Sequence, residues 1–311
     1  MLLHFLDWRA GWLIAPETAR FNAHSPLFLV SIPKAGTRLL YRLARNLGYR
    51  DGVELKDMAE PAHWYCLEYS NPHTAAPDFF IGSARREPFA NRAHPFPRTA
   101  TLFIYRNPLD IWVSEANDYH KDAAILFRGY LSELPFHERL DRLLFDPWLL
   151  GSVRDRVAKF LAWLEFPNVI PLSYEELVGA AGGGDDRIQE DLVWSIQLKL
   201  HTPGQPQQIG AGIVDADSPT FDEGRIGNYR KVLAPRLFDR FLRRDQDFME
   251  KLGYADSDLM HAPVPPARAE EFRRRPLRLS TVNNDETPSG DYDSSRSGPG
   301  ETSTGVSPAK P

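Results

Sequence analysis

The segment from Phe28 to Tyr41 reads Phe-Leu-Val-Ser-Ile-Pro-Lys-Ala-Gly-Thr-Arg-Leu-Leu-Tyr. Its apolar start, from Leu27 to Ile32, has the composition of a buried strand, and Pro33 ends it. Apolar residues then recur with helical spacing: Leu39, Leu40, Leu43, Ala44 and Leu47. The turn between strand and helix carries a lysine, a glycine and a threonine. Because such a turn points backbone N–H groups and a helix N-terminus at one place, it favours an anion.

A second strand-and-helix unit begins at residues 101–105, which have the composition of a buried strand. An asparagine and a proline follow Arg106 and suit the first positions of a helix that carries Ser114. Arg106 is therefore expected at the carboxyl end of a strand, where open α/β sheets bind ligands. Arg106 and Ser114 can converge on one phosphate. The alternative is a buried Arg106 paired with Asp110 and a serine on the helix surface.

The composition is that of a globular protein with a sizeable core. The 311 residues are 42% hydrophobic and 25% charged, which fits one large α/β domain or two small ones. A net charge of −5 gives no indication of a nucleic-acid partner. The single cysteine, Cys66, forms no internal disulfide, so we expect a reducing compartment, the cytoplasm. No apolar stretch approaches the roughly 20 residues of a transmembrane segment.

Composition also predicts how the chain is divided. We expect an N-terminal extension at 1–25, a folded domain at 26–255, a linker with a short helix at 256–280 and a disordered tail at 281–311. The tail is rich in Ser, Gly, Pro, Asp and Thr and has too few apolar residues to offset its chain entropy. The basic run 273–275 is interpreted as solvated.

Other segments are assigned from pattern. Residues 50–78 have no clear period and are expected to form a loop with short helices, followed by a strand at 79–82. The glycine-rich stretch 178–184 is interpreted as a flexible connector. Helices are expected at three further places: 153–164, 186–201 and 233–252.

Four motifs in this order resemble those of sulfotransferases that use 3′-phosphoadenosine 5′-phosphosulfate (PAPS). In the turn 33–37, Pro-Lys-x-Gly-Thr resembles their 5′-phosphosulfate loop, and it differs from a P-loop because the lysine precedes the glycine. Residues 106–114 resemble their 3′-phosphate motif. Tyr174 with Glu-Glu-Leu resembles the end of a later strand, and 224–229 (Gly-Arg-Ile-Gly-Asn-Tyr) resembles a loop that closes over the 3′-phosphate.

This resemblance, closest to bacterial-type members, implies a fold and an activity. The fold is a three-layer α/β fold with a central parallel sheet flanked by helices, the P-loop NTPase-like sulfotransferase fold. The activity is transfer of a sulfuryl group from PAPS to a hydroxyl or amine, with no metal. Lys34 would stabilise charge on the departing oxygen. The implied cofactor-binding residues are Lys34, Ala35, Gly36, Thr37, Arg38, Arg106, Ser114, Tyr174 and Arg225.

The general base departs from the family pattern, which usually has a histidine shortly after the second strand. His94 and Glu87 are the two candidates, and His94 is preferred by residue type. Two acidic residues, at 222 and 223, stand where the family has a basic pair, so Arg225 is either a phosphate ligand or a surface arginine. Tyr174 would pack near the adenine, cap the sheet core, or do both.

Three functions stay open from the sequence. The first is an active sulfotransferase whose acceptor is a small molecule, a lipid or a carbohydrate. The second is a sulfotransferase-like binding protein with impaired catalysis. The third is a kinase of related architecture, which the position of Lys34 before Gly36 disfavours. The oligomeric state is also open, with a homodimer as one alternative.

Overall fold

The computed structural model describes residues 26–51, 63–66, 99–123, 125–146, 151–214, 224–254 and 273–279. All of these residues belong to one unit, Met1–Ser280. The expected N-terminal extension and the expected tail lie outside the described residues.

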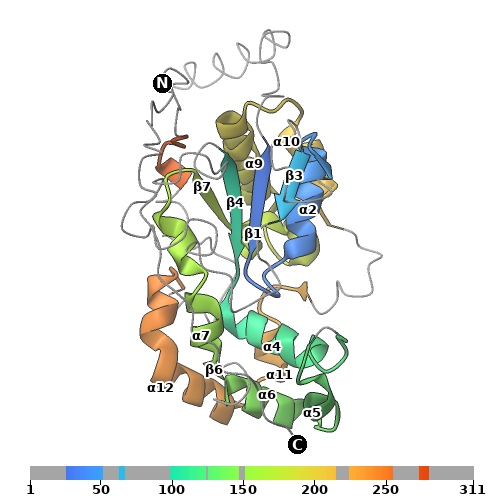
Figure 1. Cartoon of the computed structure of the whole chain (residues 1–311), viewed down its shortest axis with the longest axis vertical. Coiled ribbons are helices and arrows are strands. Elements are labelled where there is room, and N and C mark those ends of the chain that lie inside the picture. The colour runs from blue at the N-terminus through green and yellow to red at the C-terminus, as the bar shows by residue number, and fades with distance from the viewer. Residues whose placement is uncertain are drawn as a thin grey trace, which may run out of the picture. The chain divides into compact units, whose positions relative to one another are not determined.

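A parallel sheet lies at the centre of the described residues (Figure 1). Its strand order is β2-β3-β1-β4-β7. The strands are β1 (Leu27–Ser31), β2 (Arg50–Asp51), β3 (His63–Cys66), β4 (Ala100–Tyr105) and β7 (Val169–Ser173). Strand β1 pairs in parallel with β4 over its whole length, from Leu27 opposite Ala100 to Ser31 opposite Ile104. The segments that follow β1 and β4 therefore leave the sheet at the same edge.

Helices cover both faces of this sheet, so the expected three-layer α/β architecture is confirmed. Leu27 and Leu29 of β1 pack into one apolar cluster that includes residues of α2 (Thr37–Asn46), α9 (Asp186–Leu200) and α10 (Pro206–Ala211). Phe28 and Val30 pack into the opposite cluster, which includes residues of α4 (Pro108–Asp118), α6 (Phe136–Leu144), α7 (Val153–Ala158) and α12 (Pro235–Lys251). Successive strand residues point to opposite faces, and both faces are apolar because both are covered.

The remaining described elements are short. They are α5 (Arg128–Ser132), β5 (Phe145–Asp146), β6 (Gly151–Ser152), η3 (Leu161–Glu165), α8 (Tyr174–Leu177), η4 (Ala180–Gly182) and α11 (Tyr229–Val232). Strands β5 and β6 form a separate antiparallel pair.

Strand β3 corrects the prediction of a loop with short helices at residues 50–78. It pairs in parallel with β1, with Leu27 opposite Trp64. Four residues without a hydrophobic period give no local signal for a strand. The strand is stabilised by its pairing with β1, which is distant in sequence. The strand predicted at 79–82 lies outside the described residues.

The helix predicted at 153–164 is also different in the structure. It is split into α7 and the 3₁₀ helix η3. Phe160, Trp163 and Phe166 are three residues apart, and all three pack into the same apolar cluster. Trp163 lies within η3, and Phe160 and Phe166 flank it on either side.

The basic run 273–275 is not simply solvated. An Arg273 Nη atom lies 2.6 Å from a carboxylate oxygen of Glu176, which is fully buried. The Arg275 guanidinium donates to the Leu164 carbonyl (2.9 Å). The Arg278 N–H donates to the Pro167 carbonyl (3.0 Å). Residues 273–279 are therefore held against the segments that flank β7, by contacts that composition does not predict.

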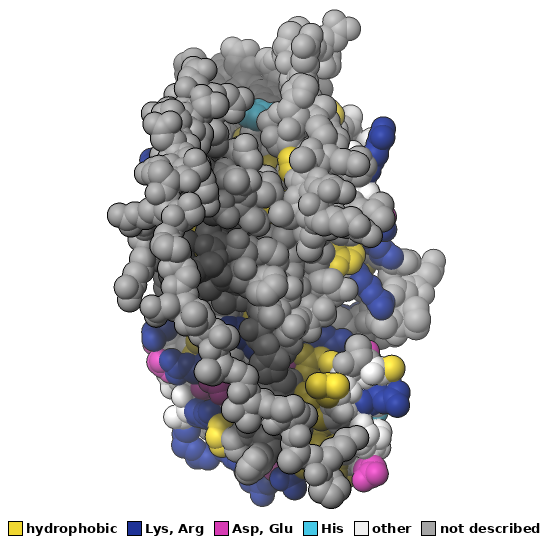
Figure 2. Space-filling model, in the orientation of Figure 1, with side chains coloured by type: hydrophobic (Ala, Val, Ile, Leu, Met, Phe, Trp, Pro, Cys, Tyr) yellow, Lys and Arg dark blue, Asp and Glu magenta, His cyan; other side chains and the backbone are white. Residues whose placement is uncertain are grey.

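Figure 2 shows several apolar side chains close together in the lower half of the view. Among the described residues, the large exposed apolar side chains are Leu126, Tyr130, Phe145 and Val232.

None of the described helices is both long and apolar enough to cross a membrane.

Candidate functional site

The turn between β1 and α2 is shaped by two residues in the left-handed region. Lys34 has φ 68° and Gly36 has φ 109°. The Ala35 N–H closes the turn by donating to the Ile32 carbonyl (2.9 Å). Within the described residues, no side chain caps the start of α2, and its first turn has no acidic residue. The first amides of α2 thus present the positive end of the helix dipole.

Gly36 is required for a second reason besides its φ angle. A Cβ atom at this position would lie 2.8 Å from Tyr174 Cδ2 and 3.2 Å from Ile104 Cδ1. Real Cβ contacts are longer than this, so the Tyr174 ring leaves room for a glycine and no larger residue. The glycine predicted from the motif therefore also brings Tyr174 against the turn.

The Thr37 hydroxyl has a partner within the protein. It donates to Ser31 Oγ (2.8 Å), and the Ser31 hydroxyl donates to the Ile32 carbonyl (2.9 Å). Its predicted role as a donor to a phosphosulfate needs this hydroxyl to turn away from Ser31. The Arg38 side chain is exposed on the first turn of α2.

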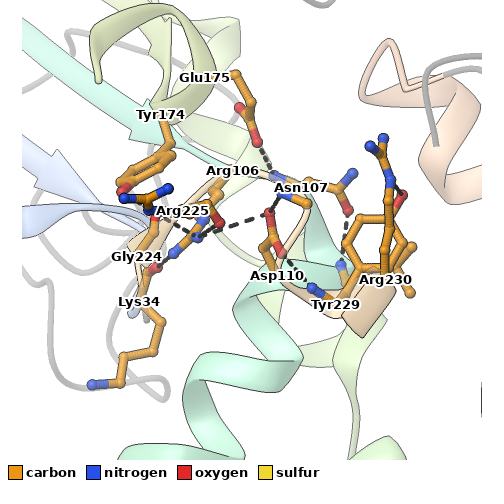
Figure 3. Close-up of polar contacts among 12 residues, drawn as sticks. Lys34, Arg106, Asn107, Asp110, Tyr174, Glu175, Gly224, Arg225, Tyr229 and Arg230 are labelled. Carbon is orange, nitrogen blue, oxygen red and sulfur yellow. Dashed lines mark hydrogen bonds and ion pairs between the residues drawn. The ribbon is translucent and has the colours of Figure 1, made fainter. Parts of the chain in front are cut away.

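Arg106 joins two of the predicted motifs (Figure 3). Its side chain is only 4% exposed. Nη1 donates to the Lys34 carbonyl (3.3 Å), and Nη2 donates to the carbonyls of Gly224 (3.1 Å) and Arg225 (3.3 Å). Its Cζ atom lies 4.1 Å from the centroid of the Tyr174 ring, and its buried Nε has no hydrogen-bond partner among the described residues. The turn after β1 and the loop 224–229 therefore meet at this guanidinium.

Asp110 holds the same loop from the other side of Arg106. Its carboxylate accepts hydrogen bonds from the backbone N–H groups of Gly227 (2.8 Å) and Tyr229 (3.1 Å), and it lies 3.8 Å from Arg106 Nη2. Burial raises the pKa of Asp110, although Arg106 and the two amides oppose this shift. The pairing of Arg106 with Asp110, which the sequence left as an alternative, is thus present.

Ser114 and Asp118 lie four residues apart on α4 and so share one face of the helix. The Lys34 ammonium forms an ion pair with the Asp118 carboxylate, and their side chains are 25% and 31% exposed. In Figure 3 the Lys34 side chain extends away from Arg106, while the Lys34 carbonyl faces it. Ser114 is partly exposed.

Tyr174 and Glu175 follow β7 and are both buried. The Tyr174 hydroxyl donates to the Gly224 carbonyl, and its ring packs between Gly36 and Arg106. The structure therefore gives Tyr174 the packing role, and contact with an adenine stays a prediction. Glu175 accepts hydrogen bonds from the Asn107 N–H (2.9 Å) and the Tyr254 hydroxyl (2.7 Å). Burial raises the pKa of Glu175 to about 7.

The remaining predicted residues are less closely tied to this site. The Arg225 side chain is exposed, and its backbone carbonyl makes the contact with Arg106. His94 and Glu87 lie outside the described residues. Within the described ranges, no three His, Cys, Asp or Glu side chains are grouped so that they could hold a metal ion.

The glycine-rich stretch 178–184 differs from its interpretation as a flexible connector. Its chain is closed by a hydrogen bond from the Gly184 N–H to the Gly179 carbonyl (2.7 Å), and the Gly182 carbonyl accepts from the Ile226 N–H (3.0 Å). This stretch therefore also helps to position the loop 224–229.

Sequence reasoning missed three polar contacts of the site. Asp118 could have been found by its spacing, because it lies one helical turn after Ser114. The amide donors that Asp110 binds and the buried carboxylate of Glu175 carried no local signal, since their partners are more than 60 residues away in sequence.

Comparisons with known proteins give structural similarity alone. No family model matches the chain, and no curated protein matches it. Mouse sulfotransferase SULT7A1 complexed with PAP is 17% identical, with a TM-score of 0.48, covering 82% of this chain and 90% of that one. Retinol dehydratase in complex with androsterone and the inactive cofactor PAP is 14% identical, with a TM-score of 0.37, covering 74% of this chain and 81% of that one.

Proposed function

We propose that this protein is a sulfotransferase that moves a sulfuryl group from PAPS to a hydroxyl or amine of a small-molecule, lipid or carbohydrate acceptor. One observation carries the proposal. The guanidinium of Arg106, from the motif expected to bind the 3′-phosphate, donates to the carbonyl of Lys34, in the turn expected to bind the 5′-phosphosulfate. Both turns leave adjacent parallel strands at the same sheet edge, where α/β proteins bind nucleotides.

The residues at this edge fit a ligand with two anionic groups. In the part of the chain that the structure describes, the start of α2 has neither a capping side chain nor an acidic first turn, which suits a phosphosulfate. Arg106 has a buried Nε without a partner among the described residues, so its donor capacity is incomplete there. We assign the phosphosulfate to Lys34, to the backbone of 35–37 and to Arg38, and the 3′-phosphate to three side chains: Arg106, Ser114 and Arg225.

PAPS supplies an activated sulfuryl group, so the protein has to position the reactants and stabilise charge. In the proposed reaction the Lys34 ammonium stabilises the negative charge that develops on the departing oxygen, and the first amides of α2 add fixed dipoles. His94 or Glu87 takes the proton of the acceptor group as general base. Tyr174 supports the turn by packing against Gly36.

The proposal is tested with adenosine 3′,5′-bisphosphate (PAP), the desulfated cofactor. The melting temperature of the protein should rise with PAP concentration, by an amount equivalent to about 2.7 kcal/mol at one hundred times the Kd. The variant Lys34→Ala should show a smaller rise. Lys251→Ala is the matched control, because Lys251 also forms an ion pair with an aspartate, Asp247. Both of these residues lie on α12. It should respond like the wild type.

Turnover is then measured with radiolabelled PAPS and a panel of hydroxyl and amine acceptors. Sulfated product from the wild type and its loss in Lys34→Ala are the expected results. PAP binding without product over the whole panel would favour the binding protein with impaired catalysis. Stabilisation by ATP and Mg²⁺ instead of PAP would favour the kinase and would overturn the proposal.

A further inference from the structure

The ion pair between Lys34 and Asp118 joins the turn after β1 to the second half of α4. The two residues are 84 positions apart in sequence, and about a quarter to a third of each side chain is exposed. Asp118 lies one helical turn beyond Ser114, which the proposed function places beside the nucleotide. The Lys34 ammonium, which the proposed reaction needs, is thus paired with the Asp118 carboxylate.

We propose that Asp118 holds Lys34 in a resting position, and that nucleotide binding exchanges this carboxylate for the phosphosulfate. This inference rests on the proposed function. Asp118 acts through Lys34 and is therefore a positioning residue. It competes with the nucleotide for one positive charge, and the exchange moves the ammonium from α4 to the start of α2.

The backbone of Lys34 is suited to such an exchange. Its carbonyl accepts a hydrogen bond from the buried Arg106, which fixes the main chain of the turn. The long lysine side chain can then reorient alone, since its ammonium is a flexible point charge with three donors. The part of the residue that must stay and the part that must move are therefore held by different partners.

A second ion pair on the same helix shows the contrast. Glu115 and Arg156 are almost fully buried and form a two-pronged contact, with N–O distances of 2.6 to 3.1 Å. Arg156 also donates to the Leu143 carbonyl (2.7 Å). Removing either partner would leave a buried charge, so this pair is structural. The Lys34–Asp118 pair is partly exposed, and its net stabilisation is accordingly small enough for a ligand to replace it.

Calorimetric titration with PAP tests the exchange. Asp118→Asn should bind PAP about two- to fivefold more tightly than the wild type, which is the range of partly exposed ion pairs. Asp118→Ser should show the same direction and guards against a fold defect in one variant. Asp141→Asn is the matched control, because it removes the same charge from an exposed ion pair between Asp141 on α6 and Arg240 on α12. Its affinity should be unchanged.

The double variant separates competition from simple repulsion. In a Lys34→Met background, Asp118→Asn should change the PAP affinity less than about twofold, because there is no ammonium left to release. The KM for PAPS should fall in Asp118→Asn while kcat stays unchanged, since Lys34 is already on the nucleotide at saturation. This inference alone is overturned if Asp118→Asn increases the PAP affinity equally in the wild-type and Lys34→Met backgrounds. It is also overturned if the wild type binds PAP and Asp118→Asn does not increase that affinity. A wild type that does not bind PAP overturns the proposed function as well.

Discussion

Arg106, just after β4, and Asp110, in the first turn of α4, hold the two ends of the same loop. Arg106 donates to the carbonyls of Gly224 and Arg225, and Asp110 accepts from the amides of Gly227 and Tyr229. Their own charges lie 3.8 Å apart in the protein interior. The loop that the sequence associated with the 3′-phosphate is therefore positioned by the same strand end and helix start that carry Arg106.

The first prediction concerns Asp110→Asn. An asparagine has one acceptor oxygen, so one of the two loop amides would face an NH₂ group, and Arg106 would lose its nearest charge partner. We expect the free energy of unfolding in urea to fall by about 2–4 kcal/mol.

Asp141→Asn is the control for this substitution, because Asp141 pairs with Arg240 at an exposed position. Its effect should stay within about 1 kcal/mol. Similar losses in both variants would show that the Asp110 carboxylate does not anchor the loop.

The second prediction concerns Gly36→Ala. The alanine would have to adopt φ 109°, and its Cβ atom would lie 2.8 Å from the Tyr174 ring. Gly183 is the matched control, because it has φ 89° but a Cβ added there would meet no described atom within 4 Å. Gly183→Ala should cost about 1–2 kcal/mol for the left-handed backbone alone. Thermal unfolding should show a clearly larger loss for Gly36→Ala, and equal losses would rule out the contact with Tyr174 as its cause.

The third prediction is a pH dependence that arises from Glu175. Burial raises the pKa of this carboxyl from 4.5 to about 7, so the folded state binds more protons than the unfolded state between these values. Its contribution to stability is therefore complete below about pH 4.5 and is lost as the pH rises to about 7. One pKa unit corresponds to about 1.4 kcal/mol, which makes the total on the order of 3 kcal/mol.

Glu175→Gln tests this dependence, because glutamine resembles the protonated acid. It can still accept from the Asn107 N–H and can donate to the Tyr254 oxygen. The difference in unfolding free energy between Glu175→Gln and wild type should grow in favour of the variant from pH 5 to pH 8. A difference that does not change with pH would contradict the raised pKa.

The fourth prediction concerns the segment 273–279. Arg273→Gln would leave the buried Glu176 carboxylate without its cationic partner. Arg273 is itself partly exposed, so we expect a loss of about 2 kcal/mol, below the range for a fully buried pair. Arg278→Gln, at an exposed position of the same segment, should change stability by less than about 0.5 kcal/mol. Urea unfolding of both variants decides whether the Arg273 contact holds the segment in place.

Much of the local structure was predictable because its causes are local. The strand from Leu27, the N-cap role of Asn107 and the helix that ends before Gly253 all follow from residue types within a few positions of each other. The failures share one cause. Strand β3 is paired with β1, and η3 and its flanking aromatic residues pack into the core, so both depend on contacts with residues distant in sequence.

The sequence by itself determined the α/β class, the two strand-to-helix turns and the residue types that each turn presents, because propensity, capping and glycine conformation act between neighbours in the chain. Only the tertiary structure decided which of these residues meet. In the folded chain Lys34 forms an ion pair with Asp118, and Asp110 accepts hydrogen bonds from the amides of Gly227 and Tyr229. The Lys34 carbonyl accepts a hydrogen bond from Arg106. These contacts join residues more than 70 positions apart. The two contacts of Lys34 exist because parallel pairing of β1 with β4 brings two strand ends to one edge.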